Sequence, residues 1–191
     1  MNANVGMVYP VAATVQTYTP GSNISYKSGS GSNFAEAVSA SLSWERADGH
    51  FYGDDVELDS DNGVLGYTID FEPSGLSDSA RALLLGETVS TGEYTITDKA
   101  SPDVGFGYVR VMRNKGTVTY EAWWFYKLKF GVSSEETRTK ERSVEWRVPT
   151  LQGVGAGVSL DATGELSFCQ HKSFNDLASA KSYLNTKAGI T

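Results

Sequence analysis

Two runs of sequence decide how this chain folds: Val104-Gly105-Phe106-Gly107-Tyr108-Val109-Arg110-Val111-Met112-Arg113 and Thr117-Val118-Thr119-Tyr120-Glu121-Ala122-Trp123-Trp124-Phe125-Tyr126-Lys127-Leu128-Lys129-Phe130. Asn114-Lys115-Gly116 joins them, and Asn and Gly readily supply the positive φ angles of a tight hairpin turn. The second run is too aromatic and too long for a strand that faces solvent. We therefore predict an antiparallel hairpin whose second arm builds the core.

Three other segments, Val38–Arg46, Val64–Glu72 and Ser143–Val148, alternate apolar and polar residues with a period of two. This period is typical of a strand with one buried and one solvent-exposed face. The predicted inward residues are Val38, Ala40, Leu42, Trp44, Leu65, Tyr67, Ile69, Phe71, Val144, Trp146 and Val148. The predicted outward residues are Ser39, Ser41, Ser43, Glu45, Gly66, Thr68, Asp70, Glu72, Ser143, Glu145 and Arg147. The pattern favours a mainly β fold, an antiparallel sandwich or barrel.

Polar connections and two helices complete the prediction. Ala47–Gly63 is a long acidic excursion with embedded apolar residues, and connections of this length usually have a function or are disordered. Ser28–Asn33 is predicted to be a flexible surface loop. A helix is expected from the cap Ser77 to the glycine Gly86. A second helix, over residues 173–187, is expected to begin at the cap Ser173 and to pack on the outside of the sheet.

The composition indicates one globular domain over residues 1–191, with 40% apolar and 20% charged residues. The net charge of −7 argues against tight DNA binding, which normally requires a basic face. Cys169 stands alone, which excludes an internal disulfide, fits a reducing compartment and predicts a half-buried strand residue. No secretion signal or membrane-spanning run is expected.

The sequence contains no familiar arrangement of catalytic residues. His50 and His171 have no metal-ligand spacing, and neither a nucleophile elbow nor a phosphate-binding loop occurs. Asp54-Asp55 and Glu135-Glu136 are adjacent pairs, whereas glycosidase acids face each other across a cleft. The acidic excursion also does not match a twelve-residue calcium loop, although a metal site there stays an alternative. We predict no enzyme and no cofactor.

Most of the chain resembles the major tail tube proteins of long non-contractile-tailed bacteriophages of Gram-positive hosts. The segments that carry the resemblance are Asn4–Ala12, Tyr52–Val56, Leu76–Gly86, Val104–Tyr108, Tyr120–Lys127, Ser133–Lys140, Val144–Trp146 and Pro149–Gly153. Ser28–Asn33 and Gly155–Gly164 depart from the family pattern. The resemblance implies a β-sandwich with a flanking helix, in hexameric rings whose inner sheets form a continuous barrel.

The resemblance also implies a function and partners. The rings stack into the tube that conducts DNA during ejection, in the virion after assembly in the host cytoplasm. The implied partners are further copies of the chain, the tape measure, tail terminator and distal tail proteins, and DNA without tight binding; no membrane contact is implied.

We expect the channel to be lined by Ser39, Ser41, Ser43, Glu45, Thr68, Asp70, Glu72 and Glu145, because acidic walls repel phosphates. The alternative is that these faces lie outside the tube. The expected assembly contacts are Phe51, Tyr52, Asp54, Asp55, Val56, Leu58, Glu135, Glu136, Arg138 and Lys140. Two other functions stay open: the tube of a contractile injection or type VI secretion machine, and a carbohydrate-binding module with Trp123, Trp124 and Trp146 as an exposed platform.

Overall fold

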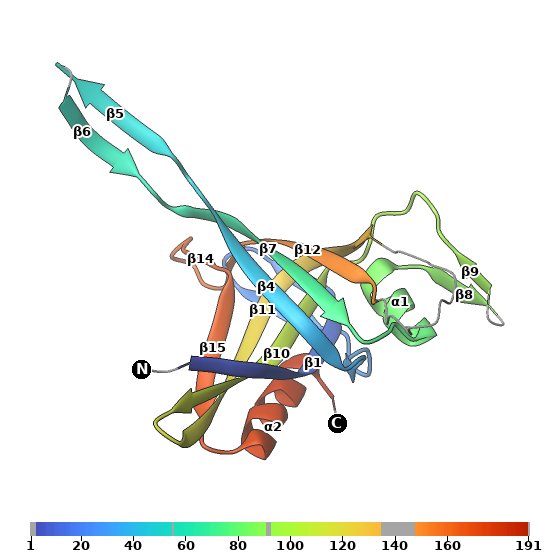
Figure 1. The fold of residues 1–191 in the computed structure, drawn as a ribbon. Helices are drawn as coiled ribbons and strands as arrows, with labels where there is room; N and C mark the ends of the chain where they lie inside the picture. The colour runs from blue at the N-terminus through green and yellow to red at the C-terminus, as the bar shows by residue number, and fades with distance from the viewer. Residues whose placement is uncertain (1–2, 55, 91–92, 135–147, 191) are drawn as a thin grey trace, which may run out of the picture.

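The strands of this protein form one large antiparallel sheet with two helices packed against it (Figure 1). The computed structural model describes residues 3–54, 56–90, 93–134 and 148–190. The main sheet contains β1 (Ala3–Thr19), β2 (Asn23–Tyr26), β3 (Ser32–Asn33), β4 (Ala37–Arg46), β7 (Val64–Pro73), β10 (Val104–Asn114), β11 (Thr117–Ser134), β12 (Thr150–Ala156) and β15 (Cys169–Phe174). Its order is β2-β1-β10-β11-β12-β7-β4, with β15 also paired to β11 and β3 to β1.

Three short ribbons and the two helices lie outside this sheet. The ribbons are β5 (Gly49–Gly53) with β6 (Val56–Asp61), β8 (Thr88–Ser90) with β9 (Glu93–Thr95), and β13 (Val158–Ser159) with β14 (Leu166–Ser167). The helices are α1 (Asp78–Leu85) and α2 (Leu177–Ala188). The mainly β fold with flanking helices is thus confirmed. Of the predicted strand Ser143–Val148, residues 143–147 lie outside the described residues and Val148 is not in a strand.

The predicted aromatic hairpin is formed by β10 and β11, but its turn differs from the prediction. Asn114 pairs with Thr117 as the last rung of the ladder. The positive φ angles are those of Lys115 (45°) and Gly116 (93°). A two-residue hairpin loop of type I′ needs positive φ at both central residues, so the strain falls on Lys115 and not on Asn114.

The length of β11 lets the sheet fold into two packed layers. One edge of β11 pairs with β10 as far as Leu128, and its other edge pairs first with β15 and then with β12. A register shift against β10, between Phe125 and Leu128, marks the bend. Aromatic pairs then join strands that are not neighbours in the sheet: Phe71 lies 5.4 Å from Phe106 between ring centres. The first core cluster is therefore enclosed between β4-β7-β12 and β1-β10-β11.

The second core cluster lies on the opposite face of β1, β10 and β11, under α2. Trp124 is fully buried there together with Leu184 of the helix. The indole Nε1 of Trp124 donates a hydrogen bond to Tyr26 Oη at 3.0 Å, and Tyr26 Oη donates to the Tyr126 carbonyl at 2.8 Å. Burial raises the pKa of Tyr26 well above its ordinary value. This half of the sheet is thus covered on both faces, and the Trp124 indole and the Tyr26 phenol are hydrogen-bonded within it.

The helix ends test the predicted caps. Ser77 caps α1 as expected, because its Oγ accepts the Ala80 amide at 3.3 Å, and Gly86 ends the helix at φ 70°. The predicted cap Ser173 is wrong: this residue lies in β15 and pairs with Glu121. Asp176 caps α2 instead, and its Oδ1 accepts the Ser179 amide at 2.7 Å. Strand pairing of residues 169–174 therefore delays the helix start.

Candidate assembly surface

One face of β4, β7, β12 and the last part of β11 is open to solvent. Two rungs cross it: Ser41, Asp70, Gln152 and Gly131 form one, and Ser43, Thr68, Val154 and Lys129 form the next. The alternate residues of these strands, such as Ile69, Phe71 and Leu151, lie in the first core cluster. This part of the sheet therefore has a single face available for contact, which we call the open face: Ser39, Ser41, Ser43, Glu45, Gly66, Thr68, Asp70, Glu72, Gln152, Val154, Ala156, Lys129 and Gly131.

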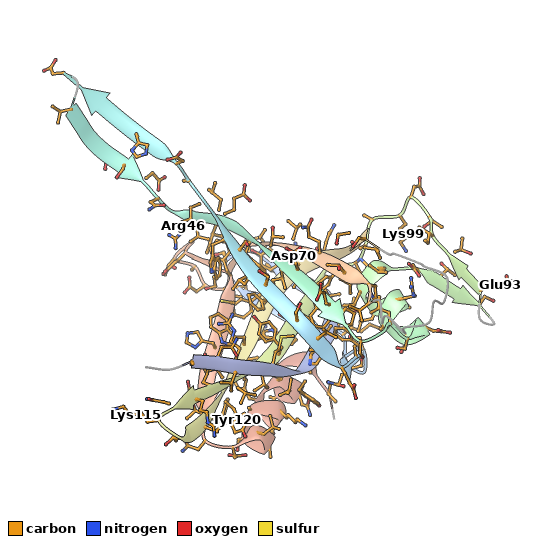
Figure 2. All side chains as sticks on the ribbon, viewed as in Figure 1. Arg46, Asp70, Glu93, Lys99, Lys115 and Tyr120 are labelled. Atoms are coloured by element: carbon orange, nitrogen blue, oxygen red, sulfur yellow. The ribbon has the colours of Figure 1, made fainter. Side chains whose placement is uncertain are left out.

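The structure brings the predicted channel-lining residues together on this face. Ser39, Ser41, Ser43, Glu45, Thr68, Asp70 and Glu72 all lie on it, exposed or half-buried, and Glu145 lies outside the described residues. Ser39 Oγ donates a hydrogen bond to Glu72 Oε2 at 2.7 Å, and Gln152 Nε2 donates to Asp70 Oδ1 at 2.9 Å. These cross-strand bonds hold carboxylates at fixed positions on the face. Figure 2 shows Asp70 within the β4-β7-β12 layer.

Two predicted inward residues point outward instead. Val38 is 57% exposed and Leu65 is 59% exposed. The β4–β7 ladder shifts register between Ala37 and Ser39, and again between Glu45 and Arg46. Val38 and Leu65 are the extra residues at these two bulges, and a bulge breaks the alternation of faces. The inward positions Tyr67, Ile69 and Phe71 are buried as predicted.

Sequence reasoning missed the contribution of β12 to the open face. Gln152, Val154 and Ala156 are exposed, while Leu151, Gly153 and Gly155 turn inward. A side chain at Gly153 would collide with Leu128 and Phe130, and one at Gly155 would collide with Tyr67. Large rings from β7 and β11 thus fill the space that β12 leaves. The alternation existed in the sequence, but glycines at its inward positions concealed it.

The open face ends at two unpaired strand edges. β4 is the last strand in the sheet order and pairs only with β7. Residues 129–134 of β11 pair with β12 on one side, while β10 ends at the level of Leu128 on the other. Within the part of the chain that the structure describes, neither edge has a partner strand. Free edges expose a row of backbone donors and acceptors that can pair with another strand.

The acidic excursion forms a β-hairpin arm that prolongs β4 and β7 beyond the body of the molecule (Figure 1). Residues 47–63 contain six acidic residues and no Lys or Arg. Ala47 donates its amide to the Gly63 carbonyl at 2.8 Å where the arm begins. Of the predicted assembly contacts, Phe51, Tyr52 and Leu58 lie on the arm strands, Asp54 is exposed near the tip with φ 50°, and Val56 is 60% exposed. Asp55, Glu135, Glu136, Arg138 and Lys140 lie outside the described residues.

A basic region lies away from the arm, at the β10–β11 hairpin and α2 (Figure 1). Arg110, Arg113, Lys115 and Lys172 lie in or beside the β10–β11 hairpin and β15, and Lys181 and Lys187 lie on α2. Figure 2 shows Lys115 at the hairpin turn, far from Arg46 at the base of the arm. Residues 104–125 and 169–190, which build this region, contain only two acidic side chains, Glu121 and Asp176. Acidic and basic side chains thus gather in different regions of the molecule.

The aromatic platform expected of a carbohydrate-binding module is not formed by the described tryptophans. Trp124 is fully buried, and Trp146 lies outside the described residues. The Trp123 ring stacks on His171 at 4.6 Å between ring centres, and the Arg110 guanidinium lies 4.3 Å from its centre. Protein groups thus occupy the ring surface that a sugar would need.

A shallow groove lies beside the end of β4, lined by Trp44, Arg46, Val64, Leu166, Ser167, Phe168 and Cys169. Cys169 is half-buried on β15, as predicted, and burial raises the pKa of its thiol.

In the described ranges, no three His, Cys, Asp or Glu side chains are grouped to hold a metal. No helix there is long and apolar enough to span a bilayer. In comparisons with known proteins, no family model, curated protein or solved structure matches the chain.

Proposed function

We propose that the protein is a structural tube subunit that assembles with further copies of itself through the two free edges of its open-faced sheet. The observation that carries this proposal is the combination of a polar, partly acidic face with strands at both of its sides that have no partner among the described residues. A closed ring of subunits satisfies both edges at once, as barrels do. The sequence resemblance to major tail tube proteins supplies the expected form: hexameric rings that stack into a DNA-conducting phage tail.

The strand directions support ring closure. β4, β7, β12 and β11 are antiparallel in order, so the two edge strands of this part run in opposite directions. A rotation about a ring axis keeps the direction of every strand relative to that axis. The β11 edge of one subunit therefore meets the β4 edge of the next in an antiparallel sense. Such a head-to-tail contact closes into a ring when the rotation divides a full turn.

The chemistry of the open face supports a channel. The opposite face of these strands is occupied by the core, so a barrel made from them presents the open face to its interior. Glu45, Asp70 and Glu72 give this face negative charge, which repels DNA phosphates and prevents tight binding. A tube structure with Asp70 and Glu72 on the outer surface would contradict this assignment.

The test of the proposal is negative-stain electron microscopy of concentrated protein, together with size-exclusion chromatography. We expect rings or tubes with a central channel. A protein that stays monomeric as its concentration is raised, with or without a tail initiator complex, would rule the proposal out.

The arm is proposed to contact an adjacent ring. It continues the direction of β4 and β7, so it leaves the barrel at one open end, and the basic region of another copy is complementary to it in charge. Deletion of residues 51–58 should leave a soluble, folded subunit that does not polymerise, as measured by sedimentation. Normal tubes from this variant would contradict the role of the arm.

A milder variant, Asp54→Asn/Asp59→Asn/Asp61→Asn, should weaken polymerisation and reduce its sensitivity to salt. The matched control removes three carboxylates elsewhere, at Asp98, Asp161 and Glu165, which are exposed and lie outside the arm. Equal effects of the two triple variants would indicate a response to net charge alone.

A further inference from the structure

We propose that Lys129 of one subunit forms an ion pair with Glu45 of the next, and that this pair selects the register in which β11 and β4 join. The inference rests on the proposed ring and identifies the contact at its seam. Both residues lie on the open face, one on each free edge strand. No other strand of the described sheet separates them from the neighbouring subunit.

The register of the sheet brings the two side chains within reach. Lys129 belongs to the rung that ends at Ser43 on the far edge of the same subunit. If this rung continues straight into the next subunit, Lys129 lies beside Ser43 of that subunit and diagonal to its Glu45. The tilt of strands in a barrel shifts the ladder between neighbouring subunits. A shift of about two residues toward the arm places Lys129 directly opposite Glu45. A shift of about four residues makes Lys129 diagonal to Glu45 again, and a long side chain still spans that distance.

Lys129 already leans toward the seam. Its Nζ lies 3.9 Å from Asp103 Oδ1, and Asp103 directly precedes β10, on the side of β11 away from β12. The other oxygen of Asp103 lies closer, 3.4 Å, to Lys127 Nζ. The Lys129 side chain keeps 51% of its surface exposed. It is therefore free to bind a second carboxylate across the seam.

Among the described residues of the two edges, opposite charges occur at one place only. The outward residues of β4 are Ser39, Ser41, Ser43 and Glu45, so an acid occurs only at the end next to the arm. Lys129 is the one base of the open face. A shift of the ladder away from the arm places Lys129 opposite the serine residues of β4.

The pair acts on register more than on affinity. An exposed ion pair contributes little stability, whereas like charges held opposite each other on adjacent strands are unfavourable. A shifted register faces Lys129 with serine and loses the ion pair, and the ring repeats that loss at every seam.

A charge exchange tests the pair. Glu45→Lys and Lys129→Glu should each raise the concentration required for ring assembly by about tenfold or more, because every seam repeats the repulsion. The double variant Glu45→Lys/Lys129→Glu should return it close to the wild-type value. Asp70→Lys is the matched control, since it makes the same charge change on the same face but on the central strand β7. Urea unfolding of each monomer verifies that all variants fold.

The outcomes separate the two proposals. Suppose that the wild type forms rings. The Glu45–Lys129 pair alone is then overturned if the single variants assemble normally, or if the double variant assembles no better than the single variants. A loss in Asp70→Lys equal to that in Glu45→Lys also overturns it, because the effect is then one of channel charge. Wild-type protein that forms no rings overturns the proposed function and the pair with it.

Discussion

The two halves of the main sheet differ in what covers them. The β1-β10-β11-β15 half is enclosed between the first core cluster and α2, and the Trp124 indole and the Tyr26 phenol are hydrogen-bonded inside the subunit. The β4-β7-β12 half has a core on one side only, with a polar face and two free edges. The first half is complete in a monomer. The second half ends, among the described residues, in unpaired strand edges, and we propose that another copy pairs with them.

The sharpest test of this difference compares two tryptophans. Trp124→Ala should lower the free energy of unfolding by about 3–5 kcal/mol, because a fully buried ring is removed from a packed site. Trp44 is 38% exposed at the open edge and only borders Tyr67 and Phe168. Trp44→Ala should therefore cost about 1 kcal/mol. Both values come from urea unfolding of the monomer.

Equal losses for the two variants would show that the β4 edge is as tightly integrated as the covered half. The division into a complete half and an open half would then fail, and with it the argument that the edge awaits a partner.

A smaller effect is expected from two glycines on neighbouring strands. Gly155→Ala should lower the free energy of unfolding by about 1–3 kcal/mol, since its new methyl group would enter the Tyr67 ring. Gly131 lies on the open face with nothing within 4 Å of an added Cβ. Gly131→Ala should be neutral or slightly stabilising, because alanine reduces the freedom of the unfolded chain. Thermal unfolding of both variants measures the contrast, and a penalty at Gly131 in the monomer would mean that the face is covered.

The smallest expected effect concerns the helix that covers the complete half. Hydrogen bonds from Ser179 lower the pKa of the Asp176 carboxylate below its ordinary value. A lowered folded-state pKa gives stability that is present above the unfolded pKa and is lost as the pH falls through the folded pKa. The wild type should therefore lose part of its stability below about pH 4 relative to Asp176→Asn, whose neutral amide caps a helix without titrating. Helix content and unfolding midpoints at pH 7 and pH 3 measure this difference; parallel pH profiles would contradict it.

Several features were predictable because local chemistry fixes them. The aromatic run forms the central strand, Ser77 and Gly86 delimit α1, and Tyr67, Ile69 and Phe71 share the buried face of β7. The start of α2 was not predictable from capping residues, because Ser173 is bound into a strand by its pairing with Glu121. The exposed positions of Val38 and Leu65 depend on bulges, which arise from the register of two strands and not from either strand alone.

The sequence by itself determined which residues can share a face, because alternation along a strand is a local property of the backbone. Only the tertiary structure decided that eight of the predicted outward residues, together with Gln152, Val154 and Lys129, form one surface. That outcome depends on rings from β7 and β11 filling the space at Gly153 and Gly155, and on β11 passing from one layer to the other. The free edges have the same origin, since an edge is defined by which strands do not meet, and that is a property of the whole packed sheet.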